Sequence, residues 1–353
     1  MQHCRPPDRG GRNQEAGKHM EKVRWGILST AKIGLEKVIP AIKRSRHGVV
    51  AAIASRAPGP AEEAAKALGI DTAYGSYEEL LADPDIDAVY NPLPNHLHVP
   101  VTLAAARAGK HVLCEKPIAL TAAEAEELKS VPKDRLVMEA FMVRFHPQWL
   151  RLRELVRSGA LGEVWAVQSF FSYSNRNPDD IRNRAEIGGG ALYDIGCYPV
   201  TAGRFVFEAE PVRVVSLVER DPDFGTDRLS SALIDFGAGR RLDFTVSTQA
   251  TPYQRLQVVG TKKRAEVLIP YNAPQGAEAL LRLDDGSTLG DGAGVLETVP
   301  ASDQYAEEAD AFALAVRGET ELPYGVDDAI ANMRVLDALF RSEKSNAWET
   351  VGG

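Results

Sequence analysis

The sequence contains no long apolar run. No uninterrupted stretch approaches the roughly 20 residues that a membrane helix needs, so we expect no membrane-spanning segment. The chain also lacks an excess of basic residues, because 41 Lys and Arg stand against 49 Asp and Glu and the net charge is −8. Nucleic-acid binding needs a basic face, so this balance argues against a nucleic-acid partner.

Cysteine is scarce, with only Cys4, Cys114 and Cys197 in the chain. Three scattered thiols make neither a disulfide framework nor a zinc site. They predict reduced cysteines in a reducing compartment, which we take to be the cytoplasm. His96 and His98 lie close together, but a closed metal site needs three or four convergent ligands. We therefore expect no metal site.

The first twenty residues differ from the rest of the chain. Residues 1–20 have few apolar side chains and no hydrophobic segment of the kind found in secretory signals. We predict that they form a disordered tail, and whether Met20 is the natural start stays open. The remainder, in a chain with 44% apolar and 25% charged residues, is typical of a globular protein. Its length suggests two domains of about 150 residues each.

Residues 21–143 alternate between apolar runs and amphipathic stretches. Alternating strands and helices are typical of a parallel sheet with right-handed crossovers, and they predict a doubly wound Rossmann domain. Pro40 lies inside the first helical stretch and should bend or break it. The strands are expected at residues 23–29, 48–55, 87–94, 111–117 and 135–141, and the helices at 33–45, 60–70, 76–84, 98–110 and 121–131.

Residues 144–353 have a different pattern, in which strands follow one another without intervening helices. This pattern predicts an α+β domain with a mostly antiparallel open sheet. We assign substrate binding and oligomerisation to it, with the exposed sheet face as the interface of a homodimer or a higher homo-oligomer. The strands are expected at 162–173, 212–220, 228–236, 240–249, 253–261, 264–270 and 279–285, and the helices at 148–159, 191–207, 303–318 and 326–344.

A possible dinucleotide motif follows the first expected strand. Residues 29–34 read S-T-A-K-I-G, where the dinucleotide fingerprint would read G-x-G-x-x-G. Ser29 and Ala31 replace the first two glycines, and Gly34 keeps the third. Small residues at a helix N-terminus allow the backbone to approach a pyrophosphate. The position between a strand and a helix fits this interpretation, although a plain turn would look similar.

The end of the second expected strand indicates which dinucleotide would be preferred. An NAD-selective site places an acidic residue there to bind the ribose 2′-hydroxyl. This chain has Ser55 and Arg56 instead. A hydroxyl and a guanidinium suit a 2′-phosphate, so the sequence favours NADP, with NAD as the alternative. Arg56 could also be a solvated surface residue.

Three further residues could transfer a proton. Lys116 lies at the end of an expected parallel strand, where ligands bind in open sheets. Asp194 and Tyr198 are four residues apart, so they share a face if the segment is helical. A nearby lysine ammonium would lower the pKa of the tyrosine from about 10 toward neutrality, where a general base works best. Asp194 would orient Lys116 and accept a proton from a substrate hydroxyl.

Several motifs together resemble one known family. The stretches WGILSTAKIG, YNPLPNHLH, AGKHVLCEKPIA, RFHP and GGGALYDIGCY are similar to those of the glucose-fructose oxidoreductase/inositol dehydrogenase family (Gfo/Idh/MocA). The resemblance covers about residues 22–349. Within the family, the chain most resembles the branch of NADP-dependent D-xylose dehydrogenases, glucose-fructose oxidoreductase and dihydrodiol dehydrogenases. The loss of two fingerprint glycines is its main departure from the family pattern.

The resemblance implies an oxidoreductase that transfers a hydride between a nicotinamide cofactor and a sugar or polyol, with aldose C1 oxidised to a lactone. The alternatives are a trans-dihydrodiol dehydrogenase, an oxidoreductase with tightly bound cofactor, and a non-catalytic regulator. It implies Tyr198 as the catalytic acid/base, with Lys116 and Asp194 beside it, and Arg144 near the nicotinamide. The implied cofactor-lining residues are Ser29, Thr30, Ala31, Lys32, Ile33, Ser55, Arg56, Pro92, Leu93, Pro94, Asn95, His98, Glu115 and Lys116.

Overall fold

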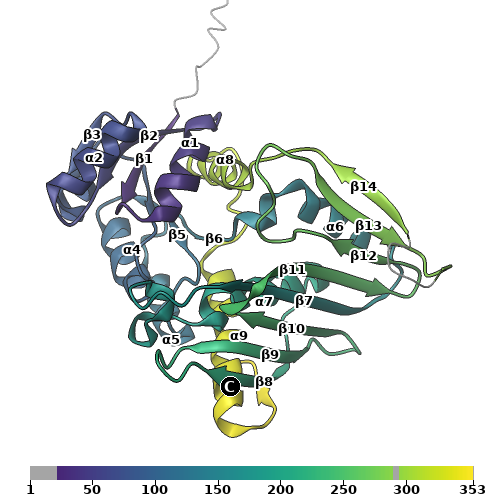
Figure 1. Ribbon diagram of the computed structural model, residues 1–353. Helices are drawn as coiled ribbons and strands as arrows, with labels where there is room; N and C mark the ends of the chain where they lie inside the picture. The colour runs from purple at the N-terminus through teal and green to yellow at the C-terminus, as the bar shows by residue number, and fades with distance from the viewer. Residues whose placement is uncertain (1–21, 289–293, 353) are drawn as a thin grey trace, which may run out of the picture.

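The computed structural model describes residues 22–288 and 294–352. The predicted tail at residues 1–20 lies outside the described residues. Figure 1 shows two sheets that lie side by side, each with its own helices. In the described part of the chain, no helix is both long enough and apolar enough to cross a membrane.

The first sheet is fully parallel and has the strand order β3-β2-β1-β4-β5-β6. This arrangement confirms the predicted Rossmann domain. Its strands are buried because helices cover both faces. The strands are β1 Val23–Leu28, β2 Gly48–Ala54, β3 Thr72–Tyr74, β4 Ala88–Asn91, β5 His111–Glu115 and β6 Val137–Ala140. The helices are α1 Ile39–Arg44, α2 Pro58–Leu68, α3 Tyr77–Ala82, α4 His98–Arg107 and α5 Ala122–Glu126.

The expected effect of Pro40 is visible in the first crossover. A π-helical turn, η1 Gly34–Val38, precedes α1, and Pro40 lies in the first turn of α1. Residues 32–44 are helical without a break, so the wider π-helical turn accommodates Pro40, which has no N–H to donate, inside the helical segment. The chain therefore changes helix type before the proline rather than breaking.

The second sheet has nine strands in the order β14-β13-β12-β11-β7-β10-β9-β8-β15. All its pairs are antiparallel except β7 with β10, as the prediction of a mostly antiparallel sheet requires. Two short strands, β14 Val295–Val299 and β15 Glu349–Thr350, were not predicted. The others are β7 Val164–Ser174, β8 Arg213–Arg220, β9 Asp227–Asp235, β10 Arg241–Ser247, β11 Gln249–Gly260, β12 Arg264–Val267 and β13 Ala279–Asp284.

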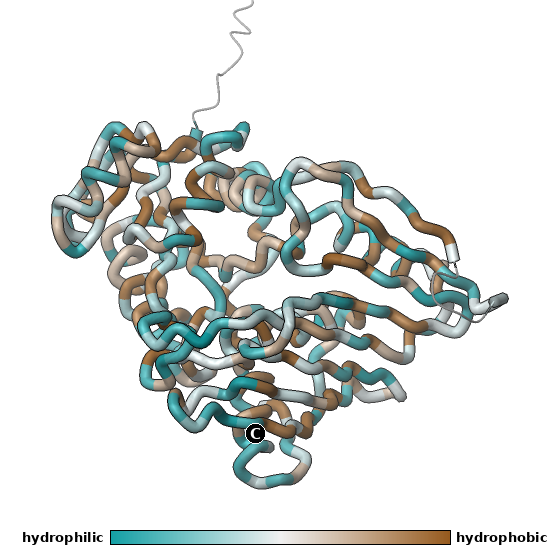
Figure 2. Tube along the Cα trace, in the orientation of Figure 1, coloured by the Kyte–Doolittle hydropathy of each residue, from teal (hydrophilic) through white to brown (hydrophobic). Residues whose placement is uncertain are grey.

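Helices cover only one face of this second sheet. The covering helices are α6 Pro147–Arg157, α7 Cys197–Phe207 and α9 Val326–Ser345. Residues along β10 alternate between buried and half-buried positions, and Figure 2 shows the corresponding alternation of hydrophobic and hydrophilic residues in these strands. Such alternation is typical of a sheet with one open face.

The penultimate helix, α8 Gln304–Val316, returns to the first sheet. Phe312 of α8 packs against Trp25 of β1 with ring centroids 5.5 Å apart, and both side chains are fully buried. Ser45, which follows α1, donates a hydrogen bond to Asp310 of the same helix. Part of the segment beyond residue 143 thus completes the core of the Rossmann domain.

Candidate active site

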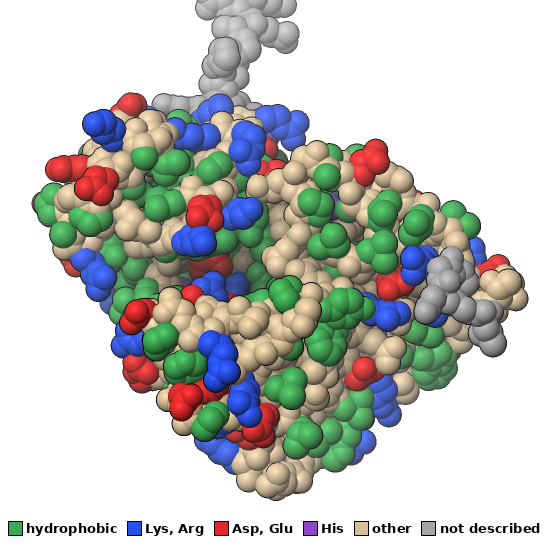
Figure 3. All heavy atoms as spheres, in the orientation of Figure 1, with side chains coloured by type: hydrophobic (Ala, Val, Ile, Leu, Met, Phe, Trp, Pro, Cys, Tyr) green, Lys and Arg blue, Asp and Glu red, His purple; other side chains and the backbone are tan. Residues whose placement is uncertain are grey.

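A cavity of about 510 Å³ lies between the two sheets, where β4 and β5 end and α7 begins. Figure 3 shows the hollow between the two halves, with acidic and basic side chains inside it. The strand order reverses direction between β1 and β4, and open α/β sheets bind ligands at such a switch point. Of the predicted site residues, the cavity is lined by Ile33, Pro92, Leu93, Asn95, His98, Glu115, Lys116, Asp194 and Tyr198.

Lys116 is held by Asp194 across the cavity floor. Its Nζ donates hydrogen bonds to the main-chain oxygen of Asp194 at 2.7 Å and to Oδ1 at 3.1 Å. Both side chains are largely buried, with 12% and 14% exposed. The sequence placed these two residues 78 positions apart, and the structure brings them together as predicted. Because the ammonium is fixed from two directions, its position relative to Tyr198 is also fixed.

Asp194 is surrounded by donors. Its Oδ2 accepts hydrogen bonds from the Tyr173 hydroxyl at 2.6 Å and from Arg182 Nε at 3.1 Å. Burial alone would raise the pKa of this carboxyl, but Lys116 and Arg182 hold the pKa well below its usual range. The carboxylate is therefore ionised and its oxygens are occupied. This corrects the expectation that Asp194 accepts a substrate proton; its geometry supports only the orientation of Lys116.

Tyr198 lies beside the lysine, but not in the predicted manner. Lys116 Nζ lies 5.2 Å from the centroid of the Tyr198 ring, and the hydroxyl donates to Met142 Sδ at 3.6 Å. Burial raises the pKa of the phenol well above its ordinary value. The expectation that Lys116 brings this pKa down to neutrality is wrong for this structure. The ammonium faces the ring, and its charge is compensated by Asp194.

His98 and Glu115 complete the strand-end loops. The His98 ring nitrogens lie 2.7 Å from the Pro117 oxygen and 2.6 Å from the Leu93 oxygen, and burial lowers the pKa of the ring to about 4. Burial favours the neutral ring, which has a single N–H and can donate a hydrogen bond to only one of these two oxygens. Glu115 accepts a hydrogen bond from the Tyr90 hydroxyl at 2.6 Å.

The fingerprint loop lies at the edge of this cavity. Ser29 has φ of +83°, the backbone region that glycine adopts without strain. Its Oγ accepts a hydrogen bond from the Ala31 N–H at 3.2 Å, which supports the turn. Ser29, Thr30 and Ala31 are half-buried and Lys32 is exposed. In this loop only Ile33 lines the cavity.

The two residues expected to choose the dinucleotide behave differently from each other. Ser55 is 6% exposed, and its hydroxyl donates to the Ala57 oxygen. Arg56 is exposed at the end of β2. Neither residue lines the cavity, and neither does Pro94. Arg56 is consequently the residue of the pair whose side chain is open to a ligand.

Arg144 is misplaced by the sequence prediction. It is 4% exposed, pairs with Asp328 and stacks on the Tyr324 ring at 4.2 Å, and it lines a different cavity from the active-site cavity. Its turn, η4 Met142–Phe145, sends Met142 into the cavity in its place. Side chains two residues apart in a tight turn point in different directions, so the motif alone could not show which of them faces the active-site cavity.

The structure adds functional residues that the sequence analysis did not single out. Tyr173, at the end of β7, holds Asp194, and Tyr305, at the start of α8, lines the cavity. Arg182, in the segment before α7, also donates a hydrogen bond to Asp194. These residues come from distant parts of the chain, and no local motif connects them.

A buried carboxylate holds the turn that carries Asp194. Asp227 of β9 is 1% exposed and accepts hydrogen bonds from the Leu192 N–H at 2.7 Å and the Ser230 hydroxyl at 3.0 Å. Leu192 begins the π-helical turn η7 Leu192–Gly196 that leads into α7. Burial raises the pKa of Asp227 to about 7. Asp227 therefore changes charge in the neutral pH range.

We expect this titration to make stability depend on pH. The folded-state pKa lies above the unfolded value, so the stabilising contribution is full at low pH and is lost as pH rises through about 7. Between about pH 6 and about pH 8.5 the contribution of Asp227 to the free energy of unfolding should fall by about 1.4 kcal/mol. Asp227→Asn should reduce the total fall over this range by about that amount, while buried Glu139, whose pKa burial raises to about 8, continues to contribute to the rest. Urea unfolding at both pH values measures this difference, and the exposed Asp223→Asn is the control. An unchanged pH dependence of the unfolding free energy in Asp227→Asn would contradict the raised pKa of Asp227.

Two family models match the chain. The model described as "Oxidoreductase family, NAD-binding Rossmann fold" matches residues 23–143, and the "GFO/IDH/MocA C-terminal domain" matches residues 149–266. The chain is 43% identical to the D-xylose 1-dehydrogenase (NADP(+)) 2 of Haloferax volcanii, over 92% of this chain and 98% of that protein.

Solved structures agree with this assignment. A 3-ketoreductase from Actinomadura kijaniata, in complex with NADP and TDP-benzene, superposes with a TM-score of 0.84 at 28% identity, covering 91% of this chain and 98% of that one. An aldose-aldose oxidoreductase from Caulobacter crescentus also gives 0.84 at 28% identity, covering 94% and 100%. Together with the Rossmann sheet, these matches establish an oxidoreductase with an NAD(P)-binding domain. The chain belongs to the GFO/IDH/MocA oxidoreductase family.

Proposed function

We propose that the protein is an NADP-dependent dehydrogenase that oxidises C1 of a cyclic aldose to a lactone. The observation that carries this proposal is the convergence of the Tyr198 phenol, Lys116 and Asp194 in one cavity at the strand ends. A protein that only bound the dinucleotide would have no need of this proton-transfer set. The similarity to the NADP-dependent xylose dehydrogenase of Haloferax volcanii supports the substrate class.

The chain has the features that a dinucleotide needs. The Ser29–Ala31 turn leads from β1 into the helical segment of residues 32–44. When bound, the nicotinamide accepts or supplies the hydride. The residues that would hold the dinucleotide are Ser29, Thr30, Ala31, Lys32, Ile33, Arg56, Pro92, Leu93, Pro94, Asn95 and Glu115, with Ser55 fixing the backbone beside Arg56.

Tyr198 holds the proton that leaves or reaches the sugar hydroxyl. In reduction its protonated phenol donates to the carbonyl oxygen, and in oxidation its phenolate accepts the hydroxyl proton. Burial favours the protonated phenol, so the oxidative rate should rise with pH as more phenolate forms. Lys116, held by Asp194, stabilises the phenolate electrostatically and keeps its position relative to the ring.

The test is an NADP⁺ reduction assay over a panel of pentoses, hexoses, inositols and a trans-dihydrodiol. Rapid turnover of an aldose supports the proposal, whereas a clear preference for the trans-dihydrodiol indicates dihydrodiol dehydrogenase activity. NADP(H) absorbance in the purified protein would indicate a tightly bound cofactor that cycles between two sugars. Dinucleotide binding without turnover of any compound would indicate the regulator.

Cofactor choice gives a separate prediction. Arg56 is exposed beside the buried Ser55 and is the guanidinium available to a 2′-phosphate. A charge-assisted contact contributes about 1.5–3 kcal/mol, so Arg56→Ala should lower the preference for NADP⁺ over NAD⁺ by at least about tenfold. The ratio of kcat/KM for NADP⁺ to that for NAD⁺ measures this preference, and Arg107→Ala, at an exposed position on α4, is the control. A wild-type enzyme that uses both cofactors equally would contradict the assignment.

The open face of the second sheet supports a homodimer. Large apolar side chains lie exposed there, among them Leu217 at 77%, Leu229 at 42% and Leu233 at 36%. Apolar groups on one uncovered face favour association with a second copy. Light scattering of the purified protein should give twice the mass of one chain.

A further inference from the structure

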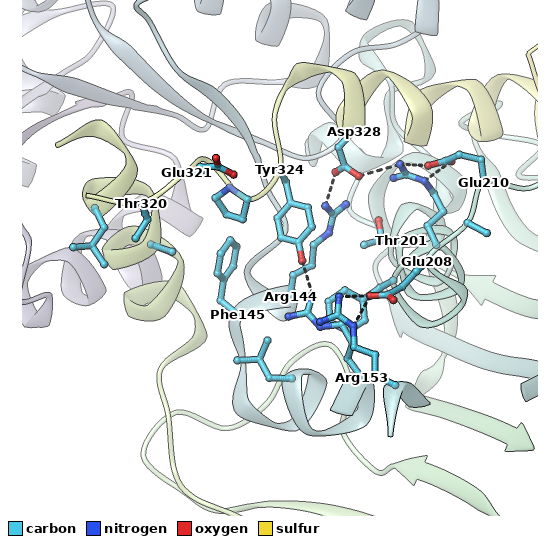
Figure 4. A pocket seen from close by; sticks show the side chains of 18 residues that line it. Arg144, Phe145, Arg153, Thr201, Glu208, Glu210, Thr320, Glu321, Tyr324 and Asp328 are labelled. Carbon is cyan, nitrogen blue, oxygen red and sulfur yellow. Dashed lines mark hydrogen bonds and ion pairs between the residues drawn. The ribbon is translucent and has the colours of Figure 1, made fainter. Parts of the chain in front are cut away.

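A second cavity, of about 750 Å³, lies apart from the active-site cavity. It is bounded by α6, α7 and the segment that joins α8 to α9 (Figure 4). It shares no lining residue with the active-site cavity. Four arginines line it, two from α6, one from η4 and one from α7: Arg144, Arg153, Arg157 and Arg204.

The inner part of this cavity has more hydrogen-bond donors than acceptors. Arg144 and Arg204 share one carboxylate, that of Asp328, and Arg204 also contacts Glu210 at 2.8 Å (Figure 4). Both guanidiniums are more than nine-tenths buried. Arg144 Nε and Arg204 Nη1 are buried without any hydrogen-bond partner. Asp328 and Glu210 therefore do not satisfy all the donors on this wall.

Arg153 has no carboxylate partner at all among the residues that the structure describes. No carboxylate oxygen of that part of the chain lies within 4.0 Å of its guanidinium. Its Cζ lies 4.7 Å from the Phe205 ring centroid, and Nη1 donates a long hydrogen bond to the Tyr324 hydroxyl at 3.4 Å. One turn further along α6, Arg157 is neutralised by Glu208. Arg153 is thus a half-buried, oriented cation without a counter-ion.

Most of the remaining wall is apolar, although Thr201, Thr320 and Glu321 also line it. Phe145, Leu150, Phe205, Leu314 and Pro323 face the same space as the arginines. Small-molecule sites typically have volumes of about 300–1,000 Å³ and combine apolar walls with a few placed polar groups. A bare inorganic anion would leave these apolar side chains uncovered, and a neutral compound would leave Arg153 without a counter-ion.

We propose that this cavity is a second ligand site, for a small organic carboxylate with an apolar body. The planar guanidinium of Arg153 matches a carboxylate with two parallel hydrogen bonds. The Tyr324 hydroxyl lies next to that position, and the apolar part of the ligand packs against Phe145 and Phe205. The inference does not rest on the substrate of the dehydrogenase reaction, because the two cavities are separate.

Calorimetric titration of the full-length protein tests this site. The probes are benzoate, benzyl alcohol and inorganic phosphate at constant ionic strength. We expect one saturable benzoate site per chain, and binding at least about tenfold weaker for benzyl alcohol and phosphate. Loss of a hydrogen bond to a charged group should make Arg153→Gln bind benzoate at least about tenfold more weakly. Arg153→Lys keeps the charge but lacks the planar guanidinium. Its affinity for benzoate should lie between those of the wild type and of Arg153→Gln.

Two control variants separate this site from others. Arg107→Gln changes an exposed arginine outside both cavities and should leave benzoate binding unchanged. Lys116→Met alters the active site and should also leave it unchanged. Benzoate binding that is lost in Lys116→Met but kept in Arg153→Gln would overturn the proposal. So would the absence of saturable binding to the wild-type protein, or equal binding of benzoate and phosphate.

Discussion

Replacing Tyr198 by Phe should lower turnover by about 10²–10⁴-fold, the usual loss when a general acid/base is removed. The substitution deletes one hydroxyl, whose hydrogen bond in the structure goes to the Met142 sulfur. The ring contacts with Phe141, Phe171 and Tyr271 remain, at centroid distances of 5.4–5.8 Å. The fold and the affinity for NADP⁺ should therefore survive. Steady-state turnover with the best substrate, together with a separate cofactor titration, measures the effect.

Tyr271 provides a matched control for this experiment. Its hydroxyl hydrogen-bonds to Ser169, and its side chain is fully buried beside Tyr198 without lining the cavity. Tyr271→Phe removes the same atom from a neighbouring ring, so its turnover should stay within a few-fold of wild type. Near-normal turnover in Tyr198→Phe would exclude Tyr198 as the proton donor and acceptor.

The second large effect is expected for Lys116→Met. Loss of the ammonium should lower turnover by about 10²–10⁴-fold, because the phenolate loses its nearby positive charge. It should also move the rise of the oxidative rate to higher pH, since the pKa of Tyr198 increases further when that charge is absent. The pH profile of turnover for both proteins shows this shift. A lysine that mattered only for folding would lower activity without moving the profile.

The double variant connects the two predictions. Because residues that act as a unit are non-additive, Lys116→Met combined with Tyr198→Phe should be little worse than either alone. Asp194 keeps Tyr173 and Arg182 as partners when the lysine is removed, so the protein should still fold. The exposed Lys66→Met on α2 is the control for a lost charge. Multiplicative losses in the double variant would show that the two side chains act independently.

The sequence predicted most of the architecture because its local patterns are strong. Continuous apolar runs such as residues 48–54 predicted buried parallel strands, and the change of pattern near residue 150 predicted the second sheet. The three missed strands, β3, β14 and β15, are short and lie at sheet edges, where no buried face imposes alternation. The return of α8 to the first sheet depends on packing between distant segments, such as Phe312 on Trp25.

The sequence predicted which residues meet in the site, but it did not predict their protonation states. The motifs identified Lys116, Asp194 and Tyr198 correctly as neighbours. The direction of each pKa depended on facts that have no local signature. These are the burial of the phenol and the two further donors, Tyr173 and Arg182, that occupy Asp194. For the same reason the motif around Arg144 gave the right segment and the wrong side chain.

The central claim is that this cavity oxidises an aldose at C1 with NADP⁺. The most direct measurement combines NADPH formation from D-xylose with identification of the product by nuclear magnetic resonance. We predict one NADPH for each sugar oxidised and a lactone or its aldonate as the product, with both lost in Tyr198→Phe. NADPH formation that yields a keto sugar would contradict oxidation at C1. Binding of NADP⁺ without turnover of any aldose would contradict the dehydrogenase itself.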